Sequence, residues 1–303
     1  MKIAVIGAGA MGCLFATKIS RTGNKVLLLD HGRRTISAIM KNGVRVIENG
    51  KTRRFRLPIQ RPPQDLRDFD LVLVLVKAYG TLIAAQELRG RIGEGTVVLT
   101  LQNGLGNFEV LTRLLGNRVL EGSTTEASLR VGPGLIEYTG KGLTVVGEPD
   151  GKKSERILKV VSLLRNAGFR SSTTRSVRSV VWSKAALNSA INPVSALTRL
   201  RNGELAKEKG LKELMFSVLN ESVRVAGAEG VTLQLGLLTR RLTFVLRLTA
   251  QNESSMLQDV LNSRKTEIRE LNGIIARLGR KHRIPTPLNE SLFSLVVGLE
   301  SNS

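Results

Sequence analysis

The chain has 303 residues, 42% of them hydrophobic, and its 46 Lys and Arg against 25 Asp and Glu give a formal net charge of +21. This length suggests two domains or one large one, and the apolar share excludes a wholly disordered protein. The longest apolar run, 71–76, is far shorter than the about 20 residues of a membrane-spanning helix. The first residues enter a strand pattern without a basic, cleavable leader, so we expect a cytoplasmic protein with no membrane partner.

The positive charge points first to nucleic acid, because a pI of about 11.0 is typical of proteins that bind it. However, the basic residues are dispersed along the chain, and only 4% of the residues are aromatic, which argues against stacking on single strands. We therefore expect nucleic acid not to be the partner. The single Cys13 cannot form an internal disulfide, and two histidines with one cysteine predict no metal site.

Short β-branched runs alternate with helical stretches in the first half of the chain. We expect strands at 3–6, 25–30, 71–76 and 97–101, helices at 11–22, 35–42 and 154–167, and a hairpin of 44–48 with 52–57 across Asn49–Gly50. A turn at 132–134 separates these from two strands at the sheet edge, 135–138 and 143–147, and a short segment at 169–174 follows the last helix. Strands that alternate with helices predict an α/β, Rossmann-type doubly wound sheet that is mostly parallel.

The pattern changes near residue 175. Apolar residues then recur at helical spacing, with almost no strand signal, through 180–189, 207–228, 238–248 and 263–282. We therefore expect an α/β domain at 1–175 and an all-α domain at 176–303.

A glycine-rich loop lies between the first predicted strand and the first predicted helix. It matches G-x-G-x-x-G with the residues Gly7, Ala8, Gly9, Ala10, Met11 and Gly12. Such glycines permit a tight turn, close approach of a pyrophosphate and close helix–strand packing, and the helix N-terminus favours the phosphates. A glycine-rich turn without a ligand is the alternative, and the placement between strand and helix favours a dinucleotide.

The residues after the second strand bear on which dinucleotide is bound. Asp30 ends this strand 18 residues after Gly12, where an acid binds a ribose 2′-hydroxyl and favours NADH. His31, Arg33 and Arg34 follow, and they could instead surround the 2′-phosphate of NADPH. The sequence leaves both cofactors open.

Several segments together resemble the ketopantoate reductase (2-dehydropantoate 2-reductase) family, in the family's order and over nearly the whole chain: GAGAMG at 7–12, VKAYGT at 76–81, LQNGLGN at 101–107, WSKAALNSAINPVSAL at 182–197 and NESSMLQDVLNSRKTEI at 252–268. The resemblance implies a Rossmann-type cofactor domain at 1–175, a helical substrate and catalytic domain at 176–303, and an active site in the cleft between them. It also implies NADPH-dependent reduction of 2-dehydropantoate to (R)-pantoate, on the route to pantothenate and coenzyme A. Family members usually carry Arg where this chain has His31, so the NADPH preference does not carry over.

Reduction of a 2-oxo acid needs a hydride donor, a proton donor and groups that bind the carboxylate. Lys184, Asn188 and Asn192 are spaced four residues apart, so they project from one face of a helix that Pro193 would end or kink. Polar side chains in an otherwise apolar stretch are costly to bury without partners, which favours a position in a cleft. We expect Lys184 to be the general acid, as the resemblance also implies, with Asn188 and Asn192 binding substrate. A surface lysine with capping amides is the alternative.

The resemblance assigns further roles in the second domain. It makes Glu267 the active-site carboxylate that orients Lys184 or binds the substrate hydroxyl. It makes Asn252 and Ser255 substrate ligands, with Ser255 at the substrate carboxylate. Spacing alone would instead favour a helix-face ion pair of Glu267 with Arg264, Lys265 or Arg269. It would also favour a helix N-cap at Ser255.

Two polar residues follow neighbouring strands of the predicted sheet. Lys77 comes after the strand 71–76 and Asn103 after the strand 97–101, and ligands of open α/β sheets bind at the carboxyl ends of such strands. The resemblance places Lys77, Asn103 and Glu267 beside the cofactor, and Asn103 beside the substrate as well. A plain Asn103–Gly104 turn is the alternative.

We thus expect an oxidoreductase that uses NADH or NADPH to reduce 2-dehydropantoate, with Lys184 as general acid and a small-molecule 2-oxo acid as its partner. Another 2-oxo acid or imine reductase with the same two domains remains open. So does a basic nucleic-acid-binding protein with a Rossmann domain as sensor, although such a sensor needs no proton donor. The sequence leaves a homodimer open as well.

Overall fold

The computed structural model describes residues 1–301 and divides the chain into two compact units. The α/β unit comprises Met1–Gln102 and Asn107–Val177, and the helical unit comprises Asn103–Gly106 and the chain from Arg178 onward. The short segment Asn103–Gly106 thus groups with the helical unit although the α/β unit flanks it on both sides. Within residues 1–301, no helix has both the length and the apolar character that crossing a bilayer would need.

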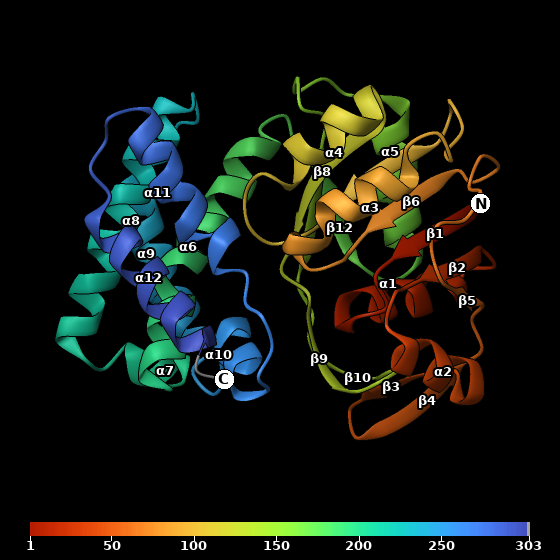
Figure 1. Ribbon diagram of the computed structural model, residues 1–303, viewed down its shortest axis with the longest axis horizontal. Coiled ribbons are helices and arrows are strands. Elements are labelled where there is room, and N and C mark those ends of the chain that lie inside the picture. Colours follow the sequence, from red (N-terminus) through yellow and green to blue (C-terminus); the bar gives the residue numbers. More distant parts are fainter. Residues whose placement is uncertain (302–303) are drawn as a thin grey trace. The chain divides into compact units, whose positions relative to one another are not determined.

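An eight-stranded sheet forms the centre of the α/β unit (Figure 1). Its strand order is β12-β11-β8-β7-β6-β1-β2-β5. The strands are, in chain order, β1 (Lys2–Ile6), β2 (Lys25–Leu29), β5 (Ile59–Gln60), β6 (Leu71–Val74), β7 (Val97–Thr100), β8 (Val119–Thr124), β11 (Leu143–Gly147) and β12 (Arg170–Thr173). From β5 to β8 all neighbours are parallel, and this is the strand order of dinucleotide-binding folds, which confirms the predicted fold class.

Helices cover both faces of this sheet because the buried strands are apolar on both sides. In β1, Ile3 and Val5 pack toward α1 (Ala10–Ser20) and α5 (Glu155–Asn166). The alternate residues Ala4 and Ile6 pack toward the opposite pair of helices, α3 (Thr81–Leu88) and α4 (Asn107–Leu115). The short 3-10 turns η1 (Ala78–Gly80) and η2 (Gly116–Arg118) complete this unit.

A second, four-stranded sheet has the order β4-β3-β10-β9. Its strands are β3 (Val44–Glu48), β4 (Lys51–Phe55), β9 (Ala127–Gly132) and β10 (Leu135–Gly140), and α2 (Arg33–Asn42) precedes it. The hairpin of β3 and β4 confirms the prediction, with both turn residues, Asn49 and Gly50, at positive φ.

The strands predicted at 135–138 and 143–147 are present, but neither is an edge strand of the main sheet, as was predicted. β10 pairs with β3 and β9 in the second sheet, and β11 lies between β8 and β12 in the main sheet. The cause is α1, whose residues from Gly12 to Thr17 are all buried. A helix buried all round needs a second apolar layer, and Val44, Val46 and Ile136 supply it from the second sheet. Cys13 of α1 is buried in the same core. Burial raises the pKa of its thiol to about 12, so the thiol stays protonated and Cys13 contributes to packing.

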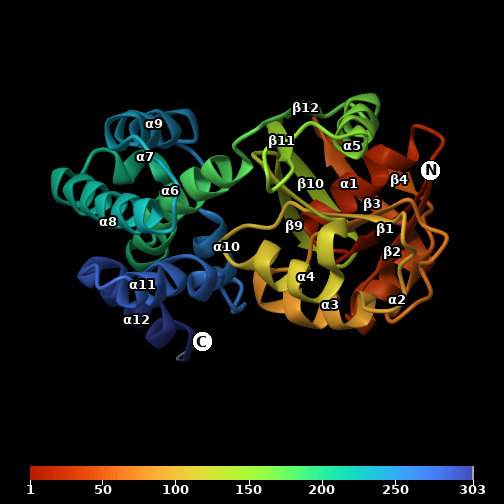
Figure 2. The same ribbon diagram turned by 90° about the horizontal axis from the view of Figure 1, so that it is seen from above.

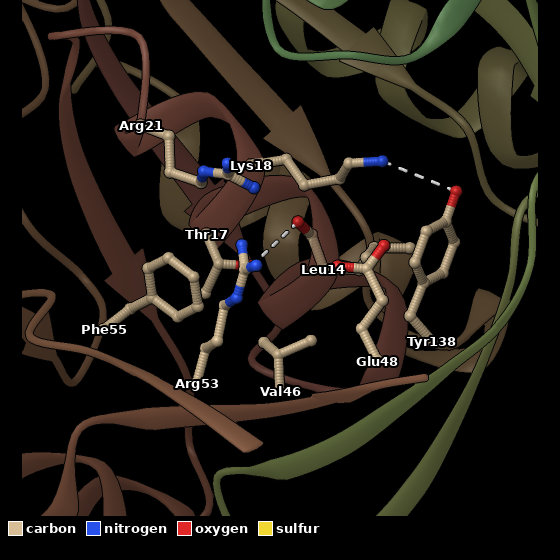
Figure 3. Close-up of a pocket in the computed structure, with 9 residues that line it drawn as sticks. All are labelled: Leu14, Thr17, Lys18, Arg21, Val46, Glu48, Arg53, Phe55 and Tyr138. Atoms are coloured by element: carbon tan, nitrogen blue, oxygen red, sulfur yellow. Dashed lines mark hydrogen bonds between the residues drawn. The ribbon is translucent and has the colours of Figure 1, made fainter. Parts of the chain in front are cut away.

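A small hollow lies between α1 and the second sheet (Figure 3). The Lys18 amine reaches the Tyr138 hydroxyl at 3.4 Å and lies 4.5 Å above the centre of the Tyr138 ring. Burial lowers the pKa of this lysine, against the charge of Glu126. None of the residues proposed above for catalysis or binding lines this hollow.

The helical unit holds, in chain order, α6 (Val177–Thr198), α7 (Asn202–Leu205), α8 (Lys209–Ala228), α9 (Leu235–Leu248), α10 (Ser255–Leu261), the 3-10 turn η3 (Ile268–Glu270), α11 (Asn272–Lys281) and α12 (Pro287–Ser301), as Figure 2 shows from above. Its core joins apolar residues of α6, α8, α9 and α12. A single helix over 263–282 was wrong, because residues 262–267 are not helical and α11 begins only at Asn272.

Pro193 does not end its helix, which was one of the two outcomes predicted for it. A proline cannot donate to the carbonyl four residues earlier, which here belongs to Ser189. The side-chain amide of Asn272 donates to this carbonyl at 2.9 Å and so replaces the missing backbone bond. α6 therefore continues to Thr198, and Asn192 lies in its interior rather than at its last turn.

Candidate functional site

The glycine loop has the geometry of a phosphate cradle. Gly7 has φ +100°, and a Cβ there would lie 2.8 Å from the backbone nitrogen of Val76. A Cβ on Gly12 would overlap the Gly7 carbonyl oxygen, so both positions exclude any side chain. Gly9 differs, because a Cβ on it would meet no atom within 4 Å.

Gly9 is also the N-cap of α1, and no side chain caps this helix. Ala10 and Met11 follow it as the first, partly exposed residues of α1. The loop therefore leaves an open surface beside helix amides, which is where a pyrophosphate binds. These residues fit a dinucleotide cofactor.

Asp30 is anchored at the end of β2. Its carboxylate accepts the backbone N–H of Ala8 at 2.7 Å and that of Gly32 at 2.7 Å, so it ties the glycine loop to the turn before α2. The next residue, His31, lies with its Nε2 2.9 Å from a carboxylate oxygen of Glu87 on α3. Arg33 begins α2 and is exposed, as is Arg34. Glu87 was not among the predicted residues. It is identified only by its contact with His31 in the fold.

A lysine, an amide and a carboxylate lie together in the helical unit. The Lys184 Nζ donates to Asn103 Oδ1 at 2.7 Å, and Asn103 Nδ2 donates to Glu267 Oε2 at 3.4 Å. Lys184 comes from α6, Asn103 from the segment 103–106 and Glu267 from the stretch before η3. Asn103 thus bridges the cation and the carboxylate.

The environment of Lys184 changes its acidity. Its side chain is only partly exposed, and the loss of hydration lowers the pKa of Lys184 to about 8, while the negative charge of Glu267 opposes a further fall. An ammonium group with this pKa remains mostly protonated at pH 7 and can release its proton readily. This arrangement suits a proton donor.

The helix that was considered for Glu267 is wrong. Glu267 lies outside any α-helix and its residue is only 6% exposed, so no helix face presents it to Arg264. The preceding Thr266 is fixed by Glu300 of α12, which accepts its backbone N–H at 2.7 Å and its hydroxyl at 2.6 Å. Glu300 of α12 therefore fixes the stretch of chain that carries Glu267.

The other predicted substrate ligands form a second group. Asn192 is buried on α6, and its Nδ2 donates to the Ser255 hydroxyl at 3.4 Å. The N-cap prediction for Ser255 was one residue off, because Ser254 caps α10 by accepting the Leu257 N–H at 3.1 Å. Ser255 is the first residue of α10 and is exposed.

The two remaining predicted substrate ligands of this unit are also asparagines. Asn188 lies on α6 between Lys184 and Asn192 and is partly exposed. Asn252 is exposed in the loop before α10, and its carbonyl accepts the backbone N–H of Asn202 at 3.0 Å. Asn202 was not predicted as a site residue. Its buried Oδ1 has no hydrogen-bond partner among residues 1–301. No sequence motif marks it, since it lies 50 residues before Asn252.

Lys77 belongs to the α/β unit. It precedes the 3-10 turn η1 as its N-cap, three residues after the end of β6, and is partly exposed. The neighbouring carbonyl of Val76 accepts the side-chain amide of Gln102 at 2.9 Å, which joins the ends of β6 and β7. Within residues 1–301, no cluster of three or more His, Cys, Asp or Glu is arranged to hold a metal ion.

Comparison with known proteins shows the family to which the chain is similar. The family model for ketopantoate reductase PanE/ApbA matches residues 3–151, and that for its C-terminal part matches residues 176–300. A 2-dehydropantoate 2-reductase of Halobacterium salinarum is 35% identical over 298 residues, which cover 98% of both chains, and one of Archaeoglobus fulgidus is 34% identical over 300 residues, covering 99% of this chain and 98% of the other.

Solved structures show the same similarity. The ketopantoate reductase from Ralstonia eutropha superposes with a TM-score of 0.91 at 32% identity, and covers 100% of this chain and 99% of its own. A D-mandelate dehydrogenase in complex with NADH and anilino(oxo)acetate superposes with a TM-score of 0.95 at 27% identity and the same coverage. The matched family models span most of the sequence, and the chain belongs to the ketopantoate reductase family.

Proposed function

We propose that this chain reduces 2-dehydropantoate to (R)-pantoate with NADH or NADPH. The observation that carries the proposal is the Lys184 ammonium group, whose pKa is lowered to about 8 and which donates to Asn103 at 2.7 Å. A proton donor of this kind has a use in carbonyl reduction and none in a protein that only senses a dinucleotide. Membership of the ketopantoate reductase family supports the substrate.

The roles of the residues follow from their chemistry. The bound dinucleotide, cradled by the loop of Gly7, Gly9 and Gly12, supplies a hydride. Lys184 donates a proton to the substrate carbonyl oxygen, so that hydride and proton together convert the ketone to an alcohol. Asn103 orients the Lys184 ammonium group through its side-chain oxygen, and the negative charge of Glu267 keeps that group protonated.

Substrate binding falls to the polar side chains around Asn192 and Ser255. The Ser255 hydroxyl is exposed and is held by Asn192, which orients it to donate to the substrate carboxylate. Asn188 and Asn252 supply further amides for the substrate hydroxyl. Lys77 contributes a positive charge near the cofactor, and a positive site attracts a substrate and a cofactor that are both anionic.

The experiment that tests this function measures initial rates with 2-dehydropantoate and each cofactor, beside a panel of other 2-oxo acids and imines. The panel includes an aryl 2-oxo acid, because one similar structure is that of a D-mandelate dehydrogenase with anilino(oxo)acetate. We expect the highest kcat/KM with 2-dehydropantoate. A higher kcat/KM with another oxo acid would contradict the substrate, and tight duplex DNA binding with a steep salt dependence and no reduction would contradict the enzyme class.

We also propose that this chain prefers NADH. Asp30 is held by two backbone amides at the strand end where an acid binds the ribose 2′-hydroxyl, and it would repel a 2′-phosphate. His31 stands where family members usually carry Arg, and the adjacent Glu87 adds a second negative charge. Arg33 and Arg34 are the opposing influence, and their exposure to solvent weakens it.

The preference predicts a response to removal of the Glu87 charge. Glu87→Gln is expected to strengthen NADPH binding about fivefold, since one repulsive contact of about 1 kcal/mol is relieved, and to leave NADH binding unchanged. His31→Arg should act in the same direction. Fluorescence titration gives the dissociation constant of each cofactor without turnover, and Glu109→Gln on α4 removes an exposed charge as the matched control. Tighter binding of NADPH than NADH by the unaltered chain would refute the preference.

A further inference from the structure

The segment that carries Asn103 lies directly on the backbone of Glu270. Gly104 has φ +82°, and a Cβ there would lie 2.6 Å from the Glu270 carbonyl oxygen and 2.9 Å from the Glu270 Cβ. The backbone N–H of Leu105 donates to the same carbonyl at 2.9 Å. Glycine is therefore required at 104 for two reasons, the left-handed backbone and the close approach.

The contact determines where Asn103 lies. Asn103 immediately precedes Gly104, and its side chain bridges Lys184 at 2.7 Å and Glu267 at 3.4 Å. Glu267 lies only three residues before Glu270, and their stretch of chain is held from α12 through the bonds of Thr266 to Glu300. One short piece of backbone thus places the carboxylate and also receives the segment that brings the amide.

We propose that Gly104 and the Glu270 carbonyl form a positioning device that holds Asn103 against Lys184 in the catalytic arrangement. The proposal rests on the proposed function, in which Lys184 is the proton donor. Gly104 is then a positioning residue, because it acts through Asn103. Any side chain at 104 must push the segment away from Glu270 and withdraw the Asn103 oxygen from the lysine.

The simpler interpretation is that Gly104 only permits a turn. Gly106 separates the two interpretations, since it has nearly the same φ, +86°, in the same segment. A Cβ on Gly106 would meet only the Cδ1 atom of Ile274 at 3.0 Å, which is the far end of a flexible side chain. Gly106→Ala therefore imposes the same backbone strain as Gly104→Ala without the collision with a backbone carbonyl.

The experiment compares Gly104→Ala with Gly106→Ala. For Gly104→Ala we expect kcat with 2-dehydropantoate to fall at least tenfold. For Gly106→Ala we expect kcat within about threefold of the unaltered chain. Thermal unfolding of the two variants separates the stability cost of the shared backbone strain from that of the collision at Gly104.

A second readout needs no turnover. The rate at which an amine-acylating reagent labels Lys184, followed by mass spectrometry across pH, gives the ionisation midpoint of this lysine. The unaltered chain should show a midpoint near 8, and Gly104→Ala should move it upward, because a displaced segment lets water reach the ammonium group. If Gly104→Ala does not fold, Asn103→Ala opens the same place without adding an atom and should give the same upward shift.

The outcomes are distinct. An unchanged midpoint and kcat in Gly104→Ala, or equal losses in Gly106→Ala, would overturn the positioning device. Lack of turnover by the unaltered chain would instead overturn the proposed function, while the labelling comparison would still decide whether Gly104 positions Asn103 against the lysine.

Discussion

Lys184→Ala is expected to lower kcat by about 10²–10⁴-fold, which is the usual contribution of a general acid, while the cofactor dissociation constant stays unchanged. The reason is that Lys184 is not among the residues expected to hold the cofactor, whereas the glycine loop and Asp30 are. Steady-state kinetics and a fluorescence titration of the cofactor measure the two effects separately. Near-normal turnover would contradict the assignment of Lys184 as proton donor.

The same assignment determines the pH dependence. The charged form of Lys184 gives the proton, and its pKa is about 8, so the rate of reduction should be level below pH 8 and fall about tenfold per pH unit above it. Oxidation of the alcohol needs the neutral amine and should rise through the same pH. Lys184→Arg is the control, because its group keeps the charge but cannot lose the proton in this range. It should be slow in both directions, with no midpoint near 8.

Gly9→Ala is expected to weaken cofactor binding while leaving the fold intact. The new methyl group meets no protein atom within 4 Å and Gly9 has φ −75°, which any residue can adopt. It occupies the surface that a pyrophosphate approaches, and overpacking of this kind costs about 1–3 kcal/mol, or about 5–150-fold in affinity. Cofactor titration and thermal unfolding of the same sample test both halves of the prediction.

Gly12→Ala serves as the contrast. Its methyl group would overlap the Gly7 carbonyl oxygen, so the loss should appear in stability as well as in binding. If Gly9→Ala instead bound cofactor as well as the unaltered chain, the loop would not be the phosphate cradle.

The sequence predicted those parts of the fold that are determined by residues close together in the chain. The alternation of strands and helices, the Asn49–Gly50 hairpin and the loop of Gly7, Gly9 and Gly12 each follow from residues close together in the chain. The second sheet did not, because the pairing of β10 with β3 joins segments about 90 residues apart. The continuation of α6 through Pro193 depended in the same way on the amide of Asn272, which no helix pattern contains.

The candidate site shows the same difference between residues that are close in the sequence and residues that are far apart. Spacing on one helix placed Lys184, Asn188 and Asn192 together, whereas the grouping of Glu267 with Lys184 came from the resemblance alone. Spacing suggested a helix for Glu267, and the structure has none there. Glu87 and Gly104 act through contacts with residues far away in the sequence, so only the structure could show their roles.

The grouping of Asn103–Gly106 with the helical unit has a consequence for dissecting the protein. A fragment that begins at Arg178 would retain the lysine and Glu267 but lose the amide that bridges them, since that amide comes from 75 residues upstream of the cut. The Glu270 carbonyl would likewise lose the backbone N–H of Leu105. The arrangement around Lys184 is therefore incomplete in the helical fragment alone. If the helical unit were fused to another cofactor domain, that domain would have to supply an equivalent of this four-residue segment.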